Sequence, residues 1–202
     1  MKKIYLLPLA LLALCLAFTK APSDPLAIGS TMPNATNKMK DISGKELSLS
    51  EAKKDNGLLV MFSCNTCPYV IKNQDRTKTI SAYALQQNIG VVVVNSNAAL
   101  RNNADSYEAM KAYAKEQGYH WNYVVDENSA LADAFGANRT PECFLFDKDS
   151  KLVYHGAIDD SPADANNISR EHLKVAINET VAGKAVTVKE SRSVGCTIKR
   201  KS

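Results

Sequence analysis

The chain has 202 residues, of which 45% are hydrophobic and 23% are charged. This length is enough for one domain with a full core, so we expect a single globular unit. The formal net charge of +4 falls to +1 when residues 1–21, which hold three lysines and no acidic residue, are left out. So small a charge gives no electrostatic case for nucleic-acid binding, and we expect no nucleic-acid partner.

The first 21 residues have the features of a signal peptide. Lys2 and Lys3 provide a basic start, and the apolar run Ile4–Ala17 that follows is short for a membrane span. We therefore expect an exported protein, located in the periplasm or outside the cell. Two alternatives would keep it at the membrane, namely an uncleaved N-terminal anchor or a lipid attached to Cys15.

Residues 22–202 are expected to form the domain, which begins with a β extension. Up to about residue 57 the chain is polar and rich in turn signals. The pair Ser43-Gly44 marks a turn between two short strands, and the segment "LSLSEAKK" is suited to a short helix. From about residue 184 we expect a C-terminal tail, in which the basic cluster 199–201 is solvated.

Apolar runs and helical segments alternate through the middle of the chain. Runs such as "LLVMF" and "GVVVVN" fit strands that are covered on both faces. The expected strands are 58–62, 90–95, 123–126, 143–146 and 151–156, of which the last two form a hairpin. The expected helices are 68–87, a helix capped by Asp105 or Ser106 that ends near 117, 129–135, and 171–182 with Ser169 as its N-cap. This order predicts an α/β fold with a mixed central sheet and helices on both faces.

The segment "FSCNTCPYV" places two cysteines between a strand and a helix. Pro68 is tolerated at a helix start, so Cys64 and Cys67 lie at or just before the helix N-terminus. Free N–H groups and the positive end of the helix dipole favour a thiolate there. We expect Cys64 to be the exposed, acidic thiol that attacks a disulfide, and Cys67 to be the buried thiol that resolves the mixed disulfide.

A C-x-x-C pair has two other common uses, in a zinc site and in a structural disulfide. A four-ligand zinc site needs two further ligands, usually a second close pair, and His120, His155 and His172 show no such spacing. A disulfide across so short a loop stabilises a fold only slightly. We therefore expect redox chemistry at the pair, and no metal.

A Thr-Pro step at Thr140 and Pro141 lies directly before a buried strand. Because only an X–Pro bond adopts the cis form at low cost, we expect a cis peptide here, with an ordinary trans bond as the alternative. A cis bend beside the C-x-x-C pair would expose the backbone of Thr140. An extended substrate could then form hydrogen bonds with that backbone.

Two further cysteines, Cys143 and Cys196, are isolated in the sequence. If the Cys143 sulfur faces the C-x-x-C pair, a second redox relay is possible. If it faces away, Cys143 could form a disulfide with Cys196 and fasten the tail to the sheet; two independent thiols are the remaining alternative. For an exported protein we favour the disulfide, which would stabilise the fold by on the order of 4 kcal/mol in the chain-entropy model.

Together the motifs "FSCNTCPYV", "NSN", "TPECFLFD" and "GCTIKR" resemble the peroxiredoxin-like redoxin branch of the thioredoxin superfamily. That branch contains the alkyl hydroperoxide reductases and thiol-specific antioxidant proteins, and the resemblance covers roughly residues 27–199. It implies a thioredoxin-like three-layer sandwich and thiol-disulfide chemistry without an added cofactor. Carried over to this chain, it implies a catalytic pair, Cys64 and Cys67, and a substrate-binding bend, Thr140 and Pro141.

Four further residues are possible auxiliaries of the site. Asn95 and Asn97 follow a central strand, so they either line the same face of the sheet or form an ordinary polar turn. Many thioredoxins carry an acid in the strand before the cysteines, but the strand 58–62 has none, which leaves Glu142 as the nearest candidate general base. Arg139 either assists an anion or peroxide or is simply solvated.

These features favour an exported thiol-disulfide oxidoreductase that reduces or exchanges disulfides in client proteins and receives electrons from an upstream dithiol donor. A thiol-dependent peroxidase is the first alternative, although Cys64 stands where typical peroxiredoxins carry threonine. A Sco-like copper-handling protein is the second, because soft thiolates suit Cu(I). Proteins of that type have three residues between their cysteines, however, whereas this chain has two.

Overall fold

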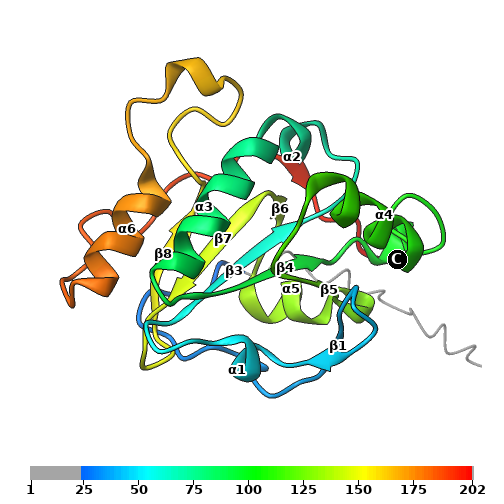
Figure 1. Ribbon diagram of the computed structural model, residues 1–202, viewed down its shortest axis with the longest axis horizontal. Helices are drawn as coiled ribbons and strands as arrows, with labels where there is room; N and C mark the ends of the chain where they lie inside the picture. The colour runs from blue at the N-terminus through cyan, green and yellow to red at the C-terminus, as the bar shows by residue number, and fades with distance from the viewer. Residues whose placement is uncertain (1–23, 202) are drawn as a thin grey trace, which may run out of the picture.

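The computed structural model describes residues 24–201, and a five-stranded mixed sheet forms its middle layer (Figure 1). The predicted signal peptide 1–21, with Cys15, lies outside the described residues. The strand order is β5-β4-β3-β7-β8. Their bounds are β3 (Leu58–Ser63), β4 (Gly90–Asn95), β5 (Asn122–Val125), β7 (Glu142–Phe146) and β8 (Leu152–Gly156).

The direction of each strand pair follows from its connection. β3 pairs in parallel with β4, and β4 with β5, because helices connect them. β7 pairs antiparallel with β3 and with β8, which a short turn joins to it. Every residue of β3 and β4 is buried, as their uninterrupted apolar runs predict. The predicted α/β, thioredoxin-like sandwich with a mixed sheet is therefore confirmed.

Helices cover both faces of the sheet (Figure 1). On one face α3 (Gln74–Gln86), α4 (Tyr107–Gln117) and α6 (His172–Val181) pack on alternate strand residues such as Leu59 and Met61. On the other face α5 (Ala130–Phe135) packs on the intervening residues, among them Phe62, whose ring meets that of Phe135 edge to face at 5.4 Å. The short 3-10 helices are η1 (Ala98–Leu100), η2 (Glu127–Ser129) and η3 (Ala165–Asn167).

Two predicted helix boundaries are wrong. The single helix expected over 68–87 is divided at Asn73 into α2 (Pro68–Lys72) and α3. The Asn73 side chain donates to the carbonyl of Tyr69, four residues earlier, and to that of Pro162, which disturbs the regular helical ladder. The N-cap of α6 is Glu171, not the predicted Ser169.

The N-terminal extension forms as predicted. β1 (Met39–Lys40) and β2 (Glu46–Leu47) pair antiparallel around the Ser43-Gly44 turn. The short helix α1 (Leu49–Ala52) follows, and its N-cap Ser48 forms a capping box with Glu51. This extension covers the same face of the sheet as α5.

The C-terminal segment is packed along most of its length. After α6 the chain returns beside β8, where His155 and Glu190 form a β-bridge. It then forms β9 (Cys196–Thr197), which pairs antiparallel with β6 (Arg139–Thr140). Arg200 is half-buried and forms an ion pair with Asp133 at 2.8 Å, so the expectation of a wholly solvated basic cluster at 199–201 is wrong.

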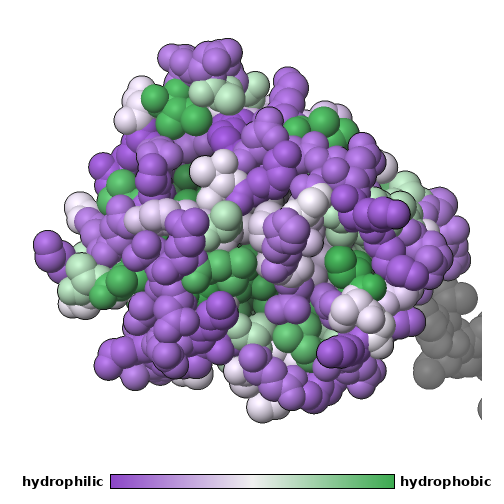
Figure 2. Space-filling view, in the orientation of Figure 1, coloured by the Kyte–Doolittle hydropathy of each residue, from purple (hydrophilic) through white to green (hydrophobic). Residues whose placement is uncertain are grey.

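The surface is polar over most of the face in Figure 2, where apolar side chains form small separate patches. Ile71 is the one large hydrophobic side chain among residues 24–201 that is classed as exposed. None of the helices in this described part of the chain is long and apolar enough to cross a membrane.

Candidate active site

The C-x-x-C pair lies between the end of β3 and the start of α2. Cys67 is the N-cap of α2 and Pro68 is its first residue, as the sequence predicts for a proline at a helix start. Cys64 and Cys67 are both largely buried, with 2% and 4% exposed surface. All four cysteines of the described chain are free thiols, so the structure shows the reduced form of the site.

The pKa shifts of the pair favour a negative charge on Cys67 rather than on Cys64. A hydrogen bond from the Cys64 thiol is the main cause that lowers the pKa of Cys67, and burial opposes the shift only in part. The Cys196 thiol and the N–H groups of Val70 and Cys196 are further causes that lower this pKa. In its thiol form Cys67 donates a hydrogen bond to the Thr140 carbonyl, 3.3 Å away.

The predicted order, in which Cys64 attacks and Cys67 resolves, stays a prediction, and the directions of the two pKa shifts favour the opposite order. Sharing a proton with Cys67, together with burial, raises the pKa of Cys64. The physical reason is position, since Cys67 and not Cys64 caps the helix, where free N–H groups favour a thiolate. Cys67 is thus suited to attack, and Cys64 to resolve.

The predicted cis bond between Thr140 and Pro141 is confirmed, and the bend lies against both cysteines. Thr140 is only 2% exposed. Its Oγ1 lies 3.6 Å from the Cys64 sulfur, and its carbonyl oxygen lies 3.3 Å from the Cys67 sulfur. The edge of β6 at Thr140 is not open as predicted, however, because Cys196 of β9 is paired with it.

Cys196 is a member of the site that the sequence prediction missed. It packs with Cys64, Cys67 and Val70. Cys143 instead lies fully buried in a different cluster, among residues such as Leu59 beneath α3 and α6, where burial raises the pKa of its thiol. The predicted Cys143–Cys196 disulfide is therefore wrong, and so is a relay through Cys143.

The carboxylate of Glu142 holds the loop before β6. One of its oxygens accepts hydrogen bonds from the N–H groups of Asn138 and Arg139, at 2.8 and 2.9 Å. The other lies 2.8 Å from Nε2 of His155. Both oxygens are thus occupied by these partners, and the general-base role of Glu142 stays a prediction. The Arg139 side chain is exposed, on the opposite side of β6 from the buried Thr140, so it is not directed at the thiols.

Asn95 and Asn97 do lie at the site, but beneath it. The side-chain amides of both donate to the buried carboxylate of Asp105, each at 2.8 Å. Asp105 also accepts from the backbone N–H of Asn65, inside the C-x-x-C loop, at 2.9 Å. From the sequence Asp105 is only an alternative N-cap of α4, a role that Ser106 fills.

Tyr123 extends this polar network. Its hydroxyl donates to Oδ1 of Asn65 at 2.9 Å and accepts from Asn95 at 3.0 Å. Asn65 is thus held through its side chain by Tyr123 and through its backbone by Asp105. The network fixes the loop that carries the two cysteines, and a buried network of this kind rigidifies its surroundings when every member is paired.

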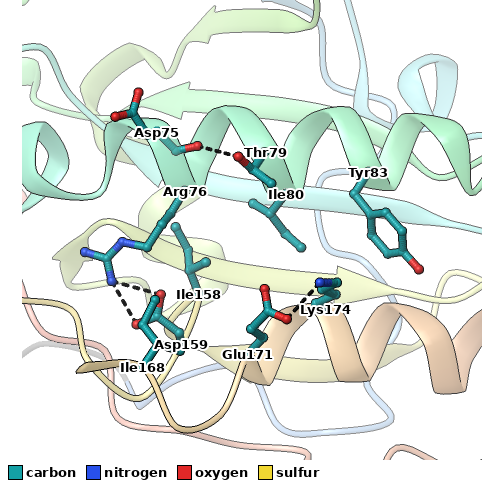
Figure 3. Close-up of a pocket in the computed structure, with 10 residues that line it drawn as sticks. All are labelled: Asp75, Arg76, Thr79, Ile80, Tyr83, Ile158, Asp159, Ile168, Glu171 and Lys174. Atoms are coloured by element: carbon teal, nitrogen blue, oxygen red, sulfur yellow. Dashed lines mark hydrogen bonds and ion pairs between the residues drawn. The ribbon is translucent and has the colours of Figure 1, made fainter. Parts of the chain in front are cut away.

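A separate cavity of about 250 Å³ lies between α3 and α6 and holds no cysteine (Figure 3). At one end Arg76 points to Asp159 and donates to both carboxylate oxygens, at 2.8 and 2.9 Å. The thiol chemistry therefore lies elsewhere. Within residues 24–201, no group of three or more His, Cys, Asp or Glu side chains is positioned to hold a metal ion.

Alkylation of Cys67 is expected to stay fast when the pH is lowered from about 8 to about 6. The lowered pKa of Cys67 keeps it a thiolate over that range, and reactivity falls only when the pH drops through this lowered value. An ordinary thiol with a pKa near 8.5 would slow by roughly 100-fold. Iodoacetamide labelling followed by peptide mass spectrometry measures the rate, and a fall parallel to that of free glutathione would contradict the assignment.

A thioredoxin-like sheet that carries a dithiol at a helix start, beside a cis-proline, defines a thiol-based redox protein. The Redoxin family model matches residues 27–170. The chain therefore belongs to the Redoxin family, and it has a thioredoxin-like redox function. A comparison with curated protein sequences gave no match.

Solved structures support the same fold. A hypothetical protein from Sinorhizobium meliloti is 31% identical, with a TM-score of 0.80 over 89% of this chain and 97% of that one. An uncharacterized conserved protein from Geobacillus kaustophilus is 33% identical, with a TM-score of 0.80 over 87% and 93% of the two chains. A PrxQ variant from Xylella fastidiosa is 17% identical, with a TM-score of 0.59 over 80% and 99%, and shows the shared fold.

Proposed function

We propose that this chain is an exported thiol-disulfide oxidoreductase that reduces or exchanges disulfides in client proteins, with Cys67 as the attacking thiolate. The observation that carries the proposal is the packing of Cys64 against Cys67 at the N-terminus of α2, beside the cis bond before Pro141. It places two thiols together at a position where a helix N-terminus favours a thiolate. That pair is what two-step disulfide exchange requires.

The chemistry transfers two electrons through two exchanges. The Cys67 thiolate attacks one sulfur of a client disulfide, the client S–S bond breaks, and the other client sulfur leaves as a thiolate. The Cys64 sulfur, after losing its proton, then attacks Cys67 and expels the second client thiolate. The client is reduced to a dithiol and the enzyme is oxidised to the Cys64–Cys67 disulfide. An upstream dithiol donor returns the enzyme to its reduced form.

Export rests on the sequence of residues 1–21, with its basic start and apolar run. An oxidising compartment outside the cytosol holds many proteins with disulfides, which are the substrates that this site suits. Cleavage of the leader would leave the redox domain free in that compartment, whereas a lipid on Cys15 would keep it at the membrane.

Peroxide reduction is the second candidate, and the lowered pKa of Cys67 favours it. A thiolate attacks hydroperoxides to form a sulfenic acid, which a neighbouring thiol converts to a disulfide. The exposed side chain of Arg139 argues against a built peroxide site, since it is not directed at the thiols. Disulfide exchange is therefore the better supported of the two.

The test compares two substrates for the same purified protein, insulin and hydrogen peroxide, with dithiothreitol as the electron donor. We expect catalysed reduction of the insulin disulfides, and consumption of peroxide at a lower specificity constant. A Cys143→Ser variant is the matched control, because this thiol is buried outside the site and should be dispensable for both reactions. Peroxide consumption without insulin reduction would overturn the proposal in favour of a peroxidase.

A further inference from the structure

The C-terminal segment occupies the strand edge beside the cysteines. β9 pairs antiparallel with β6, and Cys196 lies opposite Thr140. Figure 1 shows β9, drawn in red, beside α2. Extended peptides bind proteins by adding a strand to an edge of this kind. The chain therefore places its own strand, with a cysteine in it, where the backbone of a client would add.

The close approach of this segment depends on Gly195. A Cβ atom at that position would lie 2.0 Å from the carbonyl oxygen of Thr140, so any other residue would push the two strands apart. On the other side of β9 the chain is fixed again. The backbone N–H of Lys199 donates to Asn97 Oδ1 at 2.8 Å, and its carbonyl accepts from the N–H of Ala99 at 2.9 Å. Cys196 is thus held in place from both ends.

The Cys196 side chain is directed at the reactive sulfur. It packs with Cys64, Cys67 and Val70, and the Cys196 thiol is one of the groups that lower the pKa of Cys67. The Cys67 sulfur is therefore flanked by two thiols, those of Cys64 and Cys196. Cys196 is half-buried, whereas Cys64 is only 2% exposed, so the third thiol is the more accessible of the two flanking groups.

We propose that Cys196 is a third redox-active cysteine, which forms a disulfide with Cys67 while β9 occupies the site as an internal substrate strand. This inference rests on the proposed function, since it takes Cys67 as the attacking thiolate. Under this proposal the C-terminal segment also blocks the site, because β9 must leave the edge of β6 before the backbone of a protein client can pair there.

Either of two exchange steps gives the Cys67–Cys196 disulfide. In the first, the Cys196 thiolate attacks Cys67 in a mixed disulfide and expels the client thiolate, which takes up a proton. The client is then fully reduced, and the enzyme has been oxidised by two electrons. In the second, Cys196 attacks Cys67 in the Cys64–Cys67 disulfide and releases Cys64 as a thiol. That step moves the disulfide without net oxidation.

The deciding experiment uses the Cys64→Ser variant, in which no Cys64–Cys67 disulfide can form. The variant is treated with oxidised glutathione and quenched by acid, and its free thiols are alkylated for peptide mapping without reduction. We expect Cys67 to be glutathionylated first and then to form a Cys67–Cys196 disulfide. Because a tethered thiol has an effective concentration in the millimolar range or above, glutathione should leave at least about tenfold faster than from the Cys64→Ser/Cys196→Ser variant.

Each result decides between the two proposals. Stable glutathione on Cys67, with Cys196 still open to alkylation, would overturn the role of Cys196 and leave the proposed function intact. A Cys67 that takes up no glutathione at all would overturn both. Cys64→Ser/Cys143→Ser is the matched control and should behave as Cys64→Ser alone. Gly195→Ala in the Cys64→Ser background should slow glutathione release, and circular dichroism of each variant establishes that it is folded.

Discussion

Replacing Cys67 with serine is expected to abolish turnover with insulin, with a loss of more than about 10³-fold, on the scale seen when a covalent nucleophile is removed. A hydroxyl at the N-cap of α2 cannot ionise at neutral pH, and the described site offers no base that contacts it. The rate of insulin reduction with a dithiol donor measures this loss.

Comparison of Cys67→Ser with Cys64→Ser shows which of the two cysteines attacks the client disulfide and which one resolves the mixed disulfide. Cys67 can still attack in that variant, so a mixed disulfide should form and accumulate or pass to Cys196. In Cys64→Ala, which has no donor side chain, the main cause that lowers the pKa of Cys67 is removed, so alkylation of Cys67 should become more dependent on pH. If Cys67→Ser formed the mixed disulfide at the wild-type rate and Cys64→Ser formed none, Cys64 would be the attacking thiol.

Most of the fold could be predicted from local patterns. The apolar runs of β3 and β4 are long enough to indicate strands that are buried on both faces, and they form the centre of the sheet. The cis bond before Pro141 and the cysteine pair at a helix start were predictable for the same reason, since short segments determine them. The division at Asn73 was not, because it depends on a hydrogen bond to Pro162, far along the chain.

The finer chemistry of the site depended on details that no local pattern contains. Which cysteine ionises depends on which one caps α2, and a shift of the helix start would change the answer. The position of Cys196 depends on how the segment after α6 returns to pair with β6. Its one local signal is Gly195, the adjacent glycine that allows a close backbone approach.

The Asp105→Ala variant is expected to lose about 3–5 kcal/mol of unfolding free energy, the cost of leaving buried polar groups without their charged partner. Asp105 is completely buried, and its carboxylate accepts three hydrogen bonds, from the backbone of Asn65 and the side chains of Asn95 and Asn97. Alanine would leave the Asn65 N–H and the Asn97 amide without this buried acceptor, while the Asn95 amide would keep only its hydrogen bond to Tyr123. Denaturant unfolding followed by circular dichroism measures the change.

The same substitution should also change the pKa of Cys64, which provides a second test of the network around Asp105. Asp105 supplies a negative charge that raises the pKa of Cys64, so its removal should make Cys64 more acidic and more readily alkylated. Asp105→Asn keeps one acceptor oxygen and should lie between the wild type and alanine in stability. Asp75→Ala is the matched control, since its side chain is 93% exposed and a surface change of this kind alters stability by less than about 0.5 kcal/mol. If Asp105→Ala were as stable as that control, the loop that carries the cysteines would have to be held by contacts other than this carboxylate.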